Sequence, residues 1–243
     1  MTTVNLQISA KAKSWRVHDS EEDQALHKDA YEQVRAHVLR RDRFTCQCCE
    51  FKVVGDAASA KKTLLYSGYL EVHHIDDDHS NNNADNLLTV CPFCHSVFHC
   101  GFAGHTGSGN IAVMPYLKQR DISLLFNLLA VIKVTDESEY KKHAKEIVSF
   151  FEYFEHLAEG LMEGLSDAAI MGSVLVGTQI KDAEASSKMN NVLWPLRLIP
   201  SLDGGAFDKA ATYWKTNQLW LPEGQWPSVF AEFIKRNGLD TNK

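Results

Sequence analysis

Apolar residues recur at helical spacing along this chain, and they predict most of its elements. Residues 28–41 carry Tyr31, Val34, Val38 and Leu39 at that spacing, which indicates an amphipathic helix. Further helices are predicted at residues 119–134, 137–165, 166–172 and, as a pair, 206–237. The Leu, Ile and Phe side chains of the two long helices are typical of a buried core.

Shorter apolar runs predict strands on either side of a polar loop. Residues 70–72 resemble the end of a strand, and residues 87–90 the strand that returns beside it. Between them, residues 76–85 are rich in Asp and Asn, which favour turns. Residues 111–114 predict a separate strand closed by Pro115.

The glycine-rich segment at residues 101–109 is the best candidate for a domain boundary. It has no phosphate-loop lysine, so we interpret it as a connector with few contacts across it. The division predicted from it is a first domain at residues 1–104 and a mainly helical C-terminal domain at residues 105–243.

Composition adds limits to this picture. The chain has 243 residues, a hydrophobic fraction of 44% and a net charge of −6. No apolar run is long enough to span a membrane, so no membrane insertion is expected. The first residues lack the apolar core of a signal peptide, and we therefore expect a cytoplasmic, reducing location.

Two Cys-x-x-Cys pairs, Cys46 with Cys49 and Cys91 with Cys94, are the strongest chemical signal. Four thiolates from two tight turns close a tetrahedral site with no open position, which predicts a structural Zn²⁺. Cys48 is a rival ligand, but the pair of Cys46 and Cys49 repeats the second spacing. Cys48 and Cys100 are then expected to be buried free thiols.

Four histidines are predicted to converge beside this site. His73 and His74 end the first strand and point to opposite faces, so one can bind a metal while the other faces a water molecule. His95 and His99 are four residues apart on the predicted helix after Cys91 and project from one face. Packing alone does not readily explain a strand, loop, strand and helix with histidines in this order.

The stretch RRDRFTCQCC, the HHI step, the NL pair and CPFCH resemble the HNH (His-Me finger, ββα-metal) endonucleases with a four-Cys zinc site. The resemblance implies that His74 is the general base, with Asn86 holding the loop and the His74 ring. It implies that His73 and His95 bind a catalytic metal, and that His99 is a third ligand or a phosphate contact.

The predicted fold class is therefore α+β: an HNH ββα-metal finger with a four-Cys zinc site, plus a mainly helical C-terminal region. The implied activity is hydrolysis of DNA phosphodiester bonds with a divalent metal, Mg²⁺, Mn²⁺, Ni²⁺ or Zn²⁺. Arg41 and Arg43 lie just before the first cysteine pair. They would contact phosphate, or form a solvated face with capping charge; the sequence favours neither.

The second half has a resemblance of its own. The segments MPYLKQRDISLLFNLL, LSDAAIMG and LWPLRLIPS are similar to the IcmJ/DotN family of type IVB secretion systems. That resemblance implies a zinc-bearing HNH-like fold with a helical region, and a place in the coupling complex that recruits substrates to the secretion ATPase.

Two functions follow from these resemblances. The intact histidines favour a metal-dependent endonuclease with DNA as its partner, linked to type IV secretion or conjugative transfer. The acidic net charge and the helical half favour a zinc-stabilised, non-catalytic adaptor among type IV secretion or conjugation coupling proteins. The two are not exclusive, since a partner could supply a basic surface.

Overall fold

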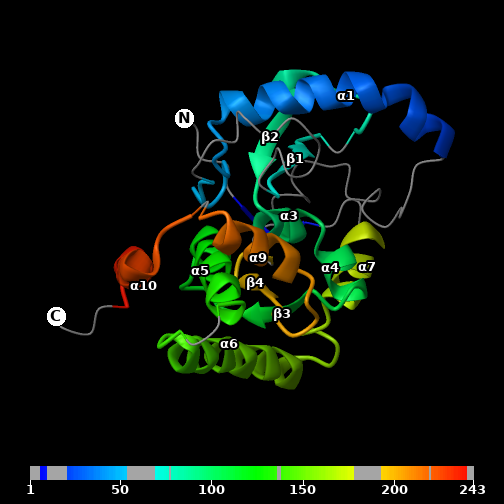
Figure 1. The fold of residues 1–243 in the computed structure, drawn as a ribbon. Helices are drawn as coiled ribbons and strands as arrows, with labels where there is room; N and C mark the ends of the chain where they lie inside the picture. Colours follow the sequence, from blue (N-terminus) through cyan, green and yellow to red (C-terminus); the bar gives the residue numbers. More distant parts are fainter. Residues whose placement is uncertain are drawn as a thin grey trace.

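The computed structural model describes residues 6–9, 21–53, 69–76, 78–135, 138–177, 193–218 and 220–239. It is a mixed helical and stranded fold with two small sheets (Figure 1). Among the helices described in these ranges, none is both long enough and apolar enough to cross a bilayer.

The first part of the chain contains the predicted strand, loop, strand and helix. Its elements are α1 (Glu21–Arg41), β1 (Glu71–His74), η2 (Ala84–Asn86), β2 (Leu87–Val90) and α3 (Pro92–Phe98). β1 and β2 pair antiparallel, with His73 opposite Leu88 and His74 opposite Leu87. All four β2 side chains are buried, because one face of this hairpin packs on α1 and the other on the rest of the molecule. The order of these elements is the predicted one.

The second part is mainly helical around a second hairpin. It comprises α4 (Cys100–His105), β3 (Gly109–Val113), α5 (Gln119–Lys133), α6 (Lys141–Leu161), α7 (Ala168–Gly177), β4 (Leu196–Pro200), α9 (Asp208–Thr216), η3 (Glu223–Gln225) and α10 (Trp226–Arg236). β3 and β4 pair antiparallel, with Ile111 opposite Leu198. Figure 1 shows α1 and α6 on opposite sides of the molecule, with α3, α5 and α9 between them.

Helix α6 is shorter than the predicted 137–165. Its C-terminus is set by the turn after it, where Gly164 has a φ of 79° that other residues rarely adopt. The Glu159 side chain accepts hydrogen bonds from the Gly164 and Ser166 N–H groups, which satisfies that turn. Asp167 then accepts from the N–H groups of Ala169 and Ile170 and caps α7.

A single buried cluster contains side chains from both parts of the chain. Phe51 of the first cysteine knuckle lies 4.6 Å from Trp214 of α9, centroid to centroid. Phe93 of α3 stacks on Phe207 at 4.1 Å. Helix α5 is buried on most of its surface and forms the centre of this cluster. The elements that carry the cysteines and histidines therefore pack against the helical part of the chain.

The predicted connector at residues 101–109 is wrong for residues 101–105, which belong to helix α4. Gly104 lies so close to α7 that a Cβ there would be 2.1 Å from the Ala169 nitrogen. Gly104 thus permits tight packing of α4 on α7 rather than an extended link. The division at residue 104 stays a prediction, although the shared core argues against independent folding.

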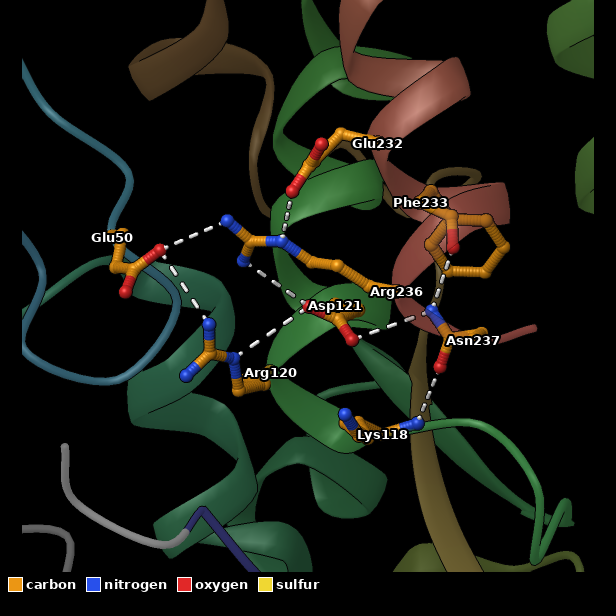
Figure 2. Close-up of polar contacts among 8 residues, drawn as sticks. All are labelled: Glu50, Lys118, Arg120, Asp121, Glu232, Phe233, Arg236 and Asn237. Atoms are coloured by element: carbon orange, nitrogen blue, oxygen red, sulfur yellow. Dashed lines mark hydrogen bonds and ion pairs between the residues drawn. The ribbon is translucent and has the colours of Figure 1, made fainter.

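The C-terminal helix is tied back to the first knuckle by polar contacts (Figure 2). Arg236 of α10 reaches Glu50 at 3.2 Å and the buried Asp121 of α5 at 3.5 Å. Asn237 donates to Asp121 and accepts from the Lys118 N–H at 3.0 Å, which satisfies a free group at the start of α5. Glu50 and Arg236, which are 186 positions apart in the sequence, are joined in this way.

Candidate metal and histidine site

The four predicted cysteines meet at one point. Cys46, Cys49, Cys91 and Cys94 are buried, and their sulfur atoms lie within 4.8 Å of one another. The first pair sits in a tight turn closed by the Thr45–Lys52 bridge. Cys91 is the N-cap of α3 and Cys94 lies in its first turn, so the two sulfurs share one end of the helix. This is the four-Cys cluster that the spacing predicts.

The surroundings of Cys91 fit a metal-bound thiolate. Its sulfur accepts hydrogen bonds from the Cys94 N–H and from the Asn127 side chain, both at 3.4 Å. Two N–H donors stabilise negative charge on sulfur, as expected for a ligand in its thiolate form. The site has the four sulfur donors that a structural zinc takes. Zinc itself remains an expectation that the donor set supports.

The two remaining cysteines lie outside the cluster. Cys48 and Cys100 are both buried and free. Burial raises the pKa of Cys100 to about 12, so it stays a thiol at neutral pH. The choice of Cys46 rather than Cys48 as the partner of Cys49 matches the cluster in the structure.

His73, His95 and His99 form a second cluster, with ligand atoms within 4.8 Å of one another. The end of β1 supplies His73, and α3 with its C-cap supplies the other two. His73 is buried and stacks on Phe98 at 4.3 Å, which fixes its ring. Three imidazoles in this arrangement could hold one divalent metal and leave positions open.

Glu71 is a member of this site that the sequence analysis missed. Its carboxylate lies 2.5 Å from His95 Nδ1. Burial opposes ionisation of Glu71, but His95 and His99 outweigh it, so the pKa of Glu71 is lowered. A carboxylate on Nδ1 orients the ring and leaves Nε2 for a metal. The signal was available: Glu71 and His73 are two apart on a strand and share a face.

His74 points away from this cluster, because successive side chains of a strand alternate between its faces. The prediction that all four histidines converge is therefore wrong for His74. Its Nε2 lies 3.0 Å from the Asn82 side-chain oxygen, and its ring stacks on Tyr31 at 5.8 Å. Burial lowers the pKa of His74 below its ordinary value, despite the contact with Asn82. The imidazole is therefore neutral at pH 7, the form that a general base requires. Neither Asn82 nor Tyr31 was predicted, because both come from other segments.

Asn86 organises the loop that carries Asn82. Its amide donates to Asp76 Oδ1 at 2.8 Å and to the Asn81 carbonyl at 3.0 Å, and its oxygen accepts from the Asp76 N–H. Asn86 thus holds the loop, and the loop holds Asn82 against His74. The positioning of the His74 ring by Asn86, which the resemblance to HNH nucleases implies, stays a prediction.

The Arg41–Asp42 pair joins α1 to the hairpin. The Arg41 guanidinium donates to the carbonyls of Ala84 and Leu87 and to Asp42, while buried Asp42 also accepts from the Thr89 N–H at 2.9 Å. Arg41 therefore uses most of its five donors inside the protein. The backbone of Arg43 is left-handed and its side chain is exposed. Phosphate contact by Arg41 and Arg43 stays a prediction.

Comparison with known proteins places this arrangement in a context. No protein-family model matches the chain. Over 218 residues the chain is 29% identical to the Type 4 apparatus protein DotN of Legionella pneumophila subsp. pneumophila, and the alignment covers 88% of this chain and 91% of DotN. The chain is thus homologous to DotN over most of its length. The resemblance to HNH nucleases stays a prediction carried by residues 41–99.

Proposed function

We propose that this protein is a metal-stabilised, non-catalytic adaptor of a type IV secretion apparatus, within the complex that couples substrates to transport. The homology to DotN, which spans both parts of the chain, carries this proposal. A match over one motif would suggest shared chemistry only. A match over nearly the whole length of both proteins suggests a shared overall role.

The metal sites suit an adaptor. A zinc held by Cys46, Cys49, Cys91 and Cys94 has no open position, so it would stabilise the fold without reacting. His74 is buried beneath Tyr31, which limits the access of a long polymer. The chain also carries a net charge of −6, whereas proteins that bind DNA by neutralising phosphates show a basic face.

The adaptor proposal predicts that the tagged chain co-purifies from its native cells with other subunits of the apparatus. Cys46→Ser should lose the metal and this association, because the ligand set supports the fold. Cys48→Ser is the matched control, since Cys48 is buried beside the site but outside the cluster. The measurements are zinc per chain by elemental analysis and mass spectrometry of the purified complex. If the tagged chain is purified without any other subunit of the apparatus, the proposal is contradicted.

The second candidate function is a metal-dependent endonuclease, favoured by the histidine geometry. His73, His95 and His99 would hold a divalent cation, and His74 lies on the opposite face of the same strand. A cation bound there would polarise a scissile phosphate and stabilise the leaving oxygen. Neutral His74, positioned by Asn82, would accept the proton of the attacking water.

The nuclease candidate predicts nicking of plasmid DNA with Mg²⁺ or Mn²⁺. His74→Ala should slow nicking by about two to four orders of magnitude, the usual contribution of a general base. His79→Ala is the matched control, because the His79 ring lies 5.1 Å from that of His74 but has no assigned role. Equal activity of the wild type and His74→Ala would show that a contaminating nuclease cleaves the DNA. The adaptor would then be the remaining candidate function.

A further inference from the structure

Helix α6 has an apolar face that no other described part of the chain covers. Its inner side chains Ala144, Phe151 and Ala158 are buried, and Phe151 packs on Phe126 of α5. A second row, which we call the outer stripe, lies at positions i, i+3, i+7 and i+11. Its members and their exposed fractions are Phe150 (49%), Tyr153 (59%), Leu157 (43%) and Leu161 (70%).

The outer stripe is a continuous feature rather than scattered exposure. Its spacing places all four side chains on one side of α6. A surface helix normally shows one apolar face, and large apolar patches on a soluble protein mark interaction sites. Figure 1 shows α6 at the edge of the molecule, with no described element beyond it.

The aromatic members are already held in place. The Phe150 ring lies 5.5 Å from Phe151 and 5.1 Å from Phe154, and Tyr153 lies 5.7 Å from Phe154. These edge-to-face contacts fix the outer rings on the inner ones. A partner would therefore lose little side-chain entropy here on binding, which is typical of interface anchors.

Charge selects the partner. Residues 146–163 contain neither lysine nor arginine, and they include Glu146, Glu152, Glu155, Glu159 and Glu163. Three of the four stripe residues lie in the C-terminal half of α6, where the helix dipole is also negative. A second copy would bring two such negative halves together, and an anionic lipid surface would be repelled. A helix rich in lysine and arginine is complementary.

We infer that the outer stripe of α6 is the docking surface for a basic amphipathic helix of a partner protein. The partner would lay its apolar face along Phe150, Tyr153, Leu157 and Leu161, with its cations in the negative field of the glutamates. This inference rests on the proposed adaptor function and adds to it the chemistry of the partner segment.

The test uses the full chain in its native cells with a benzophenone amino acid at Tyr153, and at exposed Tyr116 as the control position. After irradiation, mass spectrometry maps the attached peptide. We expect the Tyr153 adduct to lie in a Lys- and Arg-rich amphipathic helix that the Tyr116 control does not capture. An adduct with a second copy, with lipid or with an acidic segment, or no adduct, would overturn the inference.

The mapped segment is then synthesised and its binding measured by fluorescence anisotropy. Leu157→Ala with Leu161→Ala removes apolar anchors without changing the charge of α6 and should weaken binding at least about tenfold, whereas Tyr116→Ala should not. Circular dichroism confirms that both variants fold. Undiminished binding by the double variant would reject the surface. If that variant also co-purifies normally with the apparatus, the adaptor function stands and only the surface is wrong.

Discussion

At the residue scale, the chemistry depends on partners that hold each side chain in one orientation. The cysteines and histidines could be predicted because their spacing is local: three residues in a turn, four on a helix, alternation at a strand end. Asn82 and Tyr31 could not, because the contacts that bring them to His74 exist only after the loop and α1 have packed. Glu71 is intermediate, since strand alternation places it beside His73.

The loop at residues 76–86 provides a prediction with a definite pH dependence. Asp76 accepts hydrogen bonds from the Asp78 N–H, Asn81 and Asn86, which together lower its pKa to about 2. Because the pKa of Asp76 is lower in the folded protein, its ionised form stabilises the folded loop at pH values above the ordinary pKa of 3.8. This contribution to stability is lost as the pH falls through about 2. Asn86→Asp replaces a donor with a second carboxylate.

In the Asn86→Asp variant, repulsion from the new carboxylate raises the pKa of Asp76 instead of lowering it. The pH dependence of the loop's stability therefore reverses its sign. The loop should be less stable at pH 7 and should recover towards pH 4. Loss of these hydrogen bonds should reduce amide protection at Asp78 and Ser80 about five- to tenfold at pH 7. Hydrogen exchange by NMR measures this. Asn83→Asp is the control, because the Asn83 side-chain oxygen accepts a hydrogen bond from the Asp85 N–H, and a carboxylate oxygen can accept the same bond. Equal protection in both variants would show that the charge pair is not decisive.

At the element scale, periodicity predicted helices and strands well where one face is buried. The hairpin β1–β2 followed by α3 agrees with the prediction, as do α5 and the paired helices near the C-terminus. The failure is α4, where glycines were interpreted as a flexible connector. Glycine lowers helix propensity, but close packing on α7 outweighs this cost, and nothing in the local sequence reveals that packing.

Substitution of two helical glycines should therefore have opposite effects. Gly104→Ala places a methyl group 2.1 Å from a backbone nitrogen of α7, so the two helices must separate, and we expect a loss of about 1–3 kcal/mol as in other overpacked sites. Gly160→Ala meets nothing within 4 Å on α6, so the better helix propensity should stabilise by about 0.5–1 kcal/mol. Urea unfolding of the metal-loaded protein measures both. Similar effects of the two substitutions would mean that α4 and α7 are loosely packed.

At the scale of the whole molecule, the two parts of the chain are joined where the cysteine site rests on the helical part. Asn127 of α5 donates to the Cys91 sulfur, Phe51 packs on Trp214, and Arg236 reaches Glu50. Each contact crosses residue 104. Sequence patterns could not show this, because they report which residues are buried but not against which partner.

Truncation after Gly104 tests whether the parts are one folding unit. Residues 1–104 retain all four cysteines of the cluster but lose Asn127, Trp214 and the other core side chains of the helical part. We expect the fragment to aggregate or to lose its metal, because truncation exposes Phe51 and Phe93, which are buried in the full chain. Exposure of each side chain costs about 1.5–3 kcal/mol. Co-expression with residues 105–243 should restore soluble, metal-containing protein, measured by elemental analysis and size-exclusion chromatography. A soluble 1–104 fragment that holds one zinc and unfolds cooperatively on its own would show two domains, divided where the sequence placed the boundary.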